Sequence, residues 1–207
     1  EAGANIITTN TFGANPLKSE EIGESLDMII AAAIGIARKA VNSFQSEENP
    51  RFVAFDIGPC GKLLEPLGDL SFDDCYDAFA KIAKTAEKCG ADLVIIETMS
   101  DTLEAKAAVL AVKENTSLPI FCTMTFDESY KTLTGGDVKV MSAIMEGLGV
   151  DCVGINCGLG PAQIGEMMTD LAEIFNSYNG TAKRRIASNR KRQNSLQCIT
   201  RTICRRM

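Results

Sequence analysis

The chain contains no histidine among its 207 residues. Histidine is the usual general base and the commonest metal ligand, so a metal bound here would need cysteine or carboxylate ligands. Long apolar runs are also absent: none reaches the roughly 18 to 20 residues that a membrane helix needs. The first residues, EAGANIITTN, lack the basic start and apolar core of a signal peptide. These absences predict no membrane partner and a cytoplasmic location.

The eight cysteines are scattered along the chain. A disulfide framework in a small secreted domain would need a dense, regular spacing, so we expect reduced thiols. Four of them fall within helix or strand patterns and are interpreted as small apolar residues: Cys75, Cys89, Cys122 and Cys152.

Charge divides the chain into two parts. Residues 1–182 carry a net charge of −15, whereas residues 183–207 carry +9 and no acidic residue. The first part is expected to be a folded domain. The second lacks apolar periodicity and is expected to be a disordered tail, explained by a frameshift, intron read-through or truncated gene model. The less favoured alternative is a tether for nucleic acid or another anionic surface.

A weak internal repeat runs through the first 160 residues. GANIITTNT begins at Gly3, GADLVIIET at Gly90 and GVDCVGINC at Gly149. Two further strands are predicted at 52–57 and 119–124. Seven residues after each glycine, the period-two pleat places polar residues at equivalent strand ends: Asn10, Glu97 and Asn156.

Helical patterns alternate with these strands. They cover residues 17–44, 71–90, 102–114, 138–147 and 161–178. Ser71 is predicted to begin a capping box with Asp74, and Asp137 to cap the helix that follows the TGGD turn. In the first helix, the spacing predicts one buried face: Ile22, Leu26, Ile29, Ala33, Ile36 and Ala40.

Strands that alternate with helices predict a parallel sheet, either doubly wound or closed as a (β/α)8 barrel. In GLGPAQIG (158–165), the third glycine is misplaced for a dinucleotide-binding loop. Polar residues at every strand end favour an α/β fold of the TIM-barrel type. A barrel needs eight strands, so this one is expected to be incomplete, with about six strands or fewer. Two unpaired edges would then make the chain marginally stable or prone to associate.

Cys157 lies in VGINCGLGP (153–161), after a predicted buried strand. Gly158 and Gly160 permit a tight turn, and Pro161 is a favoured first helical residue. Ligands bind at the carboxyl ends of strands in parallel α/β proteins, so Cys157 is a candidate site residue. The alternative is a buried, inert thiol.

Several motifs in one order resemble the homocysteine-binding domain of the homocysteine S-methyltransferase family. They are TNTFGAN (9–15), DIGPCGKLLEPLG (56–68), IIETMSD (95–101), MTFDESYKTLTGGD (124–137) and GINCGLGP (154–161). The resemblance covers about residues 1–180 and is closest to the cobalamin-dependent methionine synthase branch. It implies a (β/α)8 barrel that activates the homocysteine thiol on zinc for methyl transfer in methionine synthesis.

The resemblance also implies a zinc site with three cysteine ligands. One falls on Cys157, but the adjacent pair of the family's G-G-C-C motif is absent here. Cys198 and Cys204 are less favoured substitutes. The family's opening strand, with its acidic motif, is absent too, whereas its partner in holding the substrate amine falls on Glu97. Methylcobalamin, as the methyl donor, and folate would act only through domains or proteins outside this chain.

The predicted metal ligand is Cys157, and the predicted substrate-binding residues are Glu97, Asn10, Thr11, Asn156, Thr123 and Asp127. Glu97 could instead pair with a lysine, although the ammonium group of an amino-acid substrate is a natural partner. Bonds to loop backbone are the alternative for Asn10 and Asn156, and turn formation for Thr123, Thr125 and Asp127. We expect a homocysteine S-methyltransferase domain that is inactive without its missing parts. The alternative is a non-catalytic interaction piece with a basic anion-binding tail.

Overall fold

The computed structural model describes residues 4–18, 25–178, 185–187 and 201–204. The strands are β1 (Ile6–Thr8), β2 (Phe52–Ile57), β3 (Leu93–Met99), β4 (Ile120–Met124), β5 (Cys152–Ile155), β6 (Arg185–Ala187) and β7 (Arg201–Cys204). The helices are α1 (Leu26–Phe44), α2 (Phe72–Lys88), α3 (Thr102–Asn115), α4 (Val138–Leu148) and α5 (Pro161–Tyr178). Strands and helices alternate from β1 to α5, as predicted.

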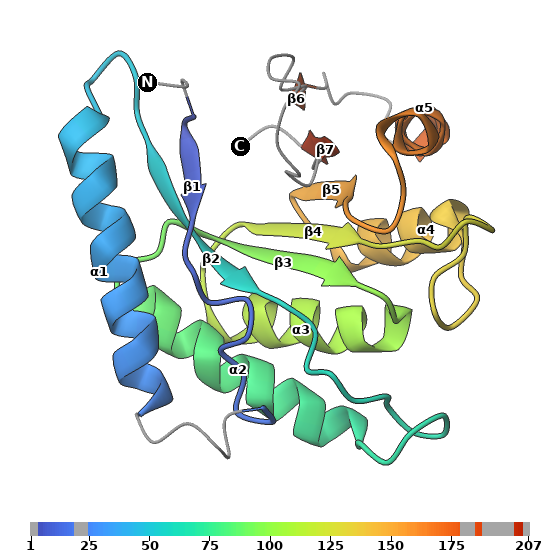
Figure 1. Cartoon of the computed structure of the whole chain (residues 1–207), viewed down its shortest axis with the longest axis horizontal. Helices are drawn as coiled ribbons and strands as arrows, with labels where there is room; N and C mark the ends of the chain where they lie inside the picture. Colours follow the sequence, from blue (N-terminus) through green and yellow to red (C-terminus); the bar gives the residue numbers. More distant parts are fainter. Residues whose placement is uncertain (1–3, 19–24, 179–184, 188–200, 205–207) are drawn as a thin grey trace.

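Strands β1 to β5 lie side by side in sequence order and are parallel. Figure 1 shows α1, α2 and α3 following one another around one side of this sheet. A doubly wound sheet reverses its strand order at a switch point, and these five strands show no such reversal. The fold is therefore an incomplete (β/α) barrel, and the prediction is confirmed.

The pleat gives the sheet two different faces. In β2, Val53, Phe55 and Ile57 belong to the main apolar core, whereas Ala54 belongs to a second, smaller cluster. That second cluster contains one residue from each of four neighbouring strands: Ala54, Leu93, Phe121 and Cys152. Because side chains alternate along a strand, the same inner face carries polar residues further toward the carboxyl ends. The barrel interior is thus apolar at one end and polar at the other.

Both predicted helix caps are present. Ser71 Oγ accepts a hydrogen bond of 3.0 Å from Asp74 N at the start of α2. Asp137 Oδ1 accepts bonds of 3.1 Å from Lys139 N and Val140 N at the start of α4. These bonds satisfy backbone donors that the first helical turn leaves free.

The prediction for the first helix is wrong in two respects. Residues 16–18 form a turn, and α1 begins only at Leu26; residues 19–24, with Ile22, lie outside the described part. Its buried face is also shifted by about one residue from the predicted one, and Ile36 is 69% exposed. The buried residues are Leu26, Ile30, Ile34, Ala37 and Val41. The helix is apolar on more than one face, so either stripe fitted the spacing.

The two ends of the barrel differ. Strand β1 is an edge of the sheet and pairs only with β2 among the described strands. Strand β5 pairs antiparallel with β7, and β7 with β6, so the prediction of two unpaired edges is wrong for β5. Both of these strands come from the predicted tail, whose other residues lie outside the described part. No helix among the described residues is long and apolar enough to cross a membrane.

Five cysteines are in the reduced thiol form, as expected: Cys60, Cys75, Cys89, Cys122 and Cys157. Cys152 is instead disulfide-bonded, so the expectation of a reduced thiol is wrong at that position.

Candidate functional site

A group of polar side chains lies at the carboxyl ends of β2 to β5. We call it the strand-end cluster, and it consists of Asp56, Glu97, Thr98, Thr123, Asn156 and Cys157. Along each strand, these positions follow apolar residues of the sheet. The parallel arrangement brings all four strand ends to the same edge, where sites of this fold type form.

Asn156 connects three of these strands. Its Oδ1 atom accepts hydrogen bonds from Thr123 Oγ1 (3.0 Å) and from Thr98 N (3.2 Å). Its Nδ2 atom donates to Thr98 Oγ1 (2.7 Å) and to Cys157 Sγ (3.5 Å). The side chain is buried, so these bonds fix the amide orientation. The thiol of Cys157 therefore sits against a rigid polar frame.

Two residues of the cluster have backbone in the left-handed region. Thr98 has φ 61° and Cys157 has φ 57°. This region costs about 1–2 kcal/mol for a residue with a side chain, and such residues concentrate at functional sites. Thr98 also lies where the pairing of β3 with β4 changes register, between Ile96 and Met99. The two bends bring Thr98 Oγ1 to 3.9 Å from Cys157 Sγ.

Two acidic residues face the same end of the barrel. Burial, and to a smaller extent the charge of Glu97, raise the pKa of Asp56 from 3.8 to about 7. Burial also raises the pKa of Glu97. Asp56 Oδ1 is buried and finds no hydrogen-bond partner among the described residues. A cation entering the site would stabilise the ionised forms of both carboxyl groups and would give Asp56 Oδ1 a partner.

The end of β1 is tied to the end of β2 by two threonines. Thr11 Oγ1 donates to the Asp56 carbonyl oxygen at 2.7 Å and lies 2.6 Å from Thr9 Oγ1. Asp56 N in turn donates to Thr9 Oγ1 at 3.1 Å. Thr11 is thus buried next to Asp56, whereas Asn10 is exposed. Of these two predicted residues, only Thr11 contacts the strand-end cluster through a hydrogen bond given by the structure.

Asp127 lies apart from the strand-end cluster, in the loop after β4. It is exposed, and its Oδ1 atom accepts hydrogen bonds from Ser129 N, Ser129 Oγ and Lys131 N. These bonds lower the pKa of Asp127. Its contacts are those of a turn former. A cavity of about 330 Å³ lies beside this loop and α5, lined by Lys131 and Glu166 among others, and includes no member of the cluster.

Cys157 does not by itself form a metal site. Within the described ranges, one group of at least three cysteine or acidic side chains lies close enough to hold a metal ion, and it consists of Cys60, Cys75 and Glu104. Of the predicted substitutes, Cys198 and the side chain of Cys204 lie outside the described part.

Sequence reasoning missed Asp56 and Thr98 as members of the candidate site. Asp56 stood at the end of a predicted strand in the same way as Glu97, so its position was a usable signal. The sequence contained no such signal for Thr98, because a β-branched residue rarely adopts the left-handed backbone conformation.

The fold is that of a (β/α)-barrel domain, and the strand-end cluster is a candidate site at the carboxyl ends of its strands. The sequence model of the family "Homocysteine S-methyltransferase" matches residues 1–197. The chain belongs to this family.

Two curated relatives are methionine synthases. The chain is 32% identical over 180 residues to that of Mycobacterium leprae, which is 84% of this chain and 15% of that protein. It is 32% identical over 179 residues to that of Mycobacterium tuberculosis, covering 83% and 15%. The chain therefore spans about 15% of the length of these relatives.

Solved structures of the homocysteine methyltransferase MmuM from Escherichia coli have a similar fold. The metallated form has a TM-score of 0.74 and 20% identity, covering 84% of this chain and 64% of that one. The apo form has a TM-score of 0.67 and 18% identity, covering 84% and 63%.

Proposed function

We propose that this domain binds homocysteine at the strand-end cluster and presents its thiol for methyl transfer to give methionine. The observation that carries this proposal is that Asp56, Glu97 and Cys157 lie at the carboxyl ends of strands of one parallel sheet. Neither of the two ion pairs found in the described part of the chain involves these acids. An amino-acid thiol offers a complementary ligand, with an ammonium group at one end and sulfur at the other.

The acidic residues would hold the substrate amine. Ionised carboxylates are costly in a buried place without a partner, and this cost raises the pKa values of Asp56 and Glu97. The ammonium group of the substrate would favour the ionised forms of Asp56 and Glu97. It would be the positively charged partner of these carboxylates, as a lysine is in a structural ion pair. Asn156 and Thr123 would shape the site through the frame described above, with Thr11 supporting Asp56.

The substrate sulfur would lie near Cys157. In the family, a bound zinc ion would favour the thiolate form of the substrate thiol. A zinc site with three protein ligands leaves its fourth coordination position open for the substrate. The described residues provide Cys157 as one ligand and do not provide the other two, so they do not fit a complete zinc site. We therefore propose that the remaining ligands come from elsewhere and that this chain is inactive without them.

The methyl donor would come from outside this chain. Its methionine synthase relatives are much longer, and the chain spans about 15% of them. We propose that methylcobalamin, charged from folate, reaches this domain through other domains or proteins of a cytoplasmic system.

The Glu97→Gln substitution tests the substrate assignment. We expect homocysteine to bind the wild-type chain and to bind Glu97→Gln at least about tenfold more weakly, because an ion pair with the ammonium group is lost. Isothermal titration calorimetry measures this, with 4-mercaptobutyrate as a ligand that lacks the amine. That ligand should bind both chains equally. Glu48→Gln, at an exposed position outside the site, is the matched control. Equal homocysteine affinity in Glu97→Gln and wild type would refute the assignment.

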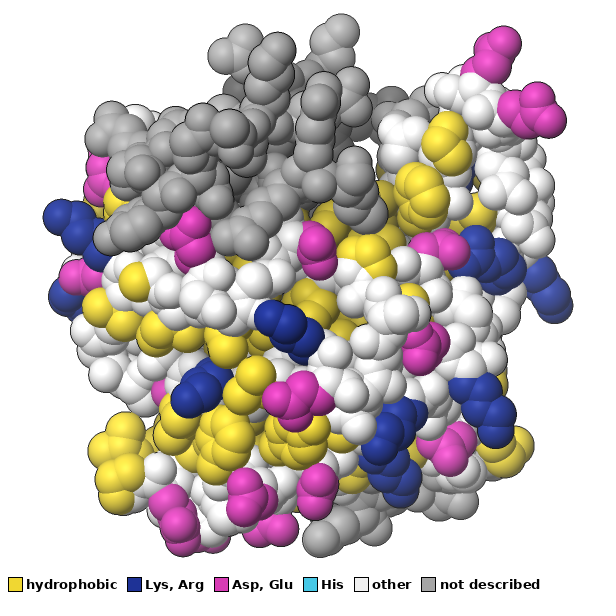
Figure 2. Space-filling view, turned by 180° about the vertical axis from the view of Figure 1, so that it is seen from behind, with side chains coloured by type: hydrophobic (Ala, Val, Ile, Leu, Met, Phe, Trp, Pro, Cys, Tyr) yellow, Lys and Arg dark blue, Asp and Glu magenta, His cyan; other side chains and the backbone are white. Residues whose placement is uncertain are grey.

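The alternative function rests on the charge of residues 183–207. A non-catalytic interaction piece would bind polyanions through this basic tail with a strong salt dependence. On the face shown in Figure 2, basic and acidic side chains are interspersed, so that face of the described part presents no extended basic patch. Salt-dependent binding to single-stranded RNA, without homocysteine binding, would favour the alternative.

A further inference from the structure

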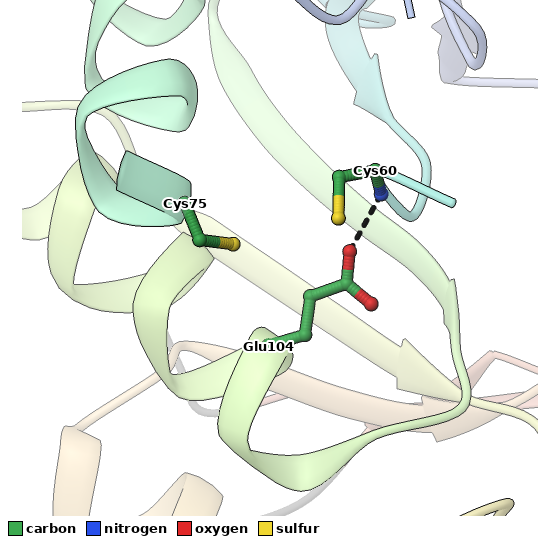
Figure 3. A group of neighbouring side chains, drawn as sticks. All are labelled: Cys60, Cys75 and Glu104. Atoms are coloured by element: carbon green, nitrogen blue, oxygen red, sulfur yellow. Dashed lines mark hydrogen bonds between the residues drawn. The ribbon is translucent and has the colours of Figure 1, made fainter. Parts of the chain in front are cut away.

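A second group of potential ligands lies outside the strand-end cluster. Figure 3 shows Cys60, Cys75 and Glu104 pointing toward one another from three different elements. Cys60 lies in the loop after β2, Cys75 in the first turn of α2 and Glu104 in the first turn of α3. Their ligand atoms all lie within 4.8 Å of one another, and all three residues are buried. Residues up to 44 positions apart in the sequence thus converge on one point.

The spacing suits a tetrahedral metal ion. Zinc binds thiolate sulfur at about 2.3 Å and carboxylate oxygen at about 2.1 Å, which places neighbouring ligand atoms about 3.6–3.8 Å apart. The ligand atoms of Cys60, Cys75 and Glu104 need only small side-chain movements to reach these distances from one another. The carbonyl oxygen of Lys62 lies 3.5 Å from Cys60 Sγ and can occupy a fourth position. Two sulfur ligands select zinc over magnesium or calcium, which prefer oxygen.

The surroundings favour anionic ligands. Cys75 and Glu104 each lie in the first turn of a helix of 14 or more residues, where the helix dipole stabilises negative charge. Glu104 Oε1 also accepts a hydrogen bond of 2.5 Å from Cys60 N. Glu104 takes part in neither ion pair of the described chain, although it is only 3% exposed. A buried carboxylate of this kind needs a cation or a proton.

We propose that Cys60, Cys75 and Glu104 form a structural zinc site, separate from the strand-end cluster. On binding, the two thiols lose their protons to solvent, as does Glu104 where it is protonated, and two Zn–S bonds and one Zn–O bond form. Zinc with these three ligands carries one negative charge. Lys18, whose side chain passes against Gly61, supplies a positive charge close to Cys60.

The zinc ion would fasten the loop after β2 to α2 and α3. This loop follows Asp56 by only a few residues, so its anchoring would also steady the carboxyl end of β2. Burial of all three ligands removes the ion from contact with substrate and makes its role structural. The proposal does not depend on homocysteine binding or on zinc at Cys157.

Zinc titration of the full 207-residue chain tests the proposal. The reduced, metal-free chain is titrated with Zn²⁺ in competition with a chromophoric chelator, and with Co²⁺ to detect thiolate ligation by absorbance. We expect one tight site in wild type. Cys75→Ser should weaken it by more than about 100-fold and Glu104→Gln by at least about tenfold, since each removes a direct ligand. Glu104→Gln nearly preserves side-chain volume and serves as the second variant should Cys75→Ser fail to fold.

Two matched variants separate this site from the others. Cys89→Ser removes a partly buried free thiol from the C-terminal end of α2, and Cys157→Ser removes the thiol of the strand-end cluster. Both should retain the tight zinc site. Absence of tight zinc binding in wild type would overturn the proposal, as would loss of the site in Cys157→Ser or its retention in folded Glu104→Gln and Cys75→Ser. A wild-type chain that binds zinc tightly but does not bind homocysteine would refute only the proposed function.

Discussion

Asn156 shows how one buried amide can organise a site. Its two side-chain atoms make hydrogen bonds to Thr98, Thr123 and Cys157, which belong to three different strand ends. An aspartate of the same shape would lose the two donated bonds and add a charge next to the carboxylates. The amide is therefore suited to orient the Cys157 thiol without adding to the negative charge of the site.

Asp56 makes the stability of the domain depend on pH. Its pKa is about 7 in the folded chain against an ordinary value of 3.8, because of burial and then the charge of Glu97. The folded state therefore holds more protons between these values, and stability falls as pH rises from about 4 to 7. The loss attributable to Asp56 is at most about 4 kcal/mol.

We expect Asp56→Asn to flatten this dependence. The free energy of unfolding, from urea titrations at pH 5 and pH 8, should fall less between these pH values in the variant than in wild type. Glu97 and Glu104 also have raised pKa values, so part of the dependence will remain. Asp69→Asn, at an exposed loop position, is the control and should behave as wild type does. If the stability of Asp56→Asn had the same pH dependence as that of wild type, folding would not raise the pKa of Asp56.

The turn between β5 and α5 is the element that positions Cys157. Gly158 has φ +67°, and a Cβ atom there would lie 2.3 Å from the Phe126 carbonyl oxygen. Only glycine fits both the conformation and the contact. The turn thus packs directly against the loop after β4.

Gly158→Ala should lower the free energy of unfolding by at least about 2 kcal/mol, because it adds a backbone collision to an unfavourable φ. Gly160→Ala is the matched control: its Cβ atom would meet only Gln163 Oε1, at 3.4 Å. That variant should lose about 1 kcal/mol or less. Urea unfolding measures both, and equal losses would contradict the packing described here.

The sequence of α1 predicts that the helix exists but does not determine which of its faces is buried. Its existence followed from apolar spacing, but that spacing fitted two neighbouring stripes. The stripe containing Ile30 and Ile34 is buried, while Ile36 and Met28 are exposed. Packing against the sheet and against α2 determines which face of α1 is buried. The apolar period of a single helix contains no information about these contacts.

At the scale of the molecule, the sheet retains an open edge at β1. This strand pairs only with β2 among the described strands, and Ile6 on it is 39% exposed. Unpaired backbone groups beside an exposed apolar side chain favour pairing with another chain. The incomplete barrel is therefore expected to associate as its concentration rises.

We expect Ile6→Lys to weaken this association by at least about tenfold, since a charge on an edge strand opposes strand pairing. Sedimentation velocity over a concentration series measures it. Met28→Lys, which places the same charge at an exposed apolar position on α1, is the control and should associate as wild type does. A wild-type chain that stays monomeric at high concentration would contradict the expectation.

The sequence by itself determined the alternation of strands and helices, the caps at Ser71 and Asp137, and the polar strand ends that include Glu97 and Asn156. These features depend on local spacing and side-chain chemistry, which a sequence displays directly. The tertiary structure decided the buried face of α1, the strained bends at Thr98 and Cys157, the raised pKa of Asp56, and the convergence of Cys60, Cys75 and Glu104. Each of these arises from contacts between residues far apart in the chain, and no local pattern records such contacts.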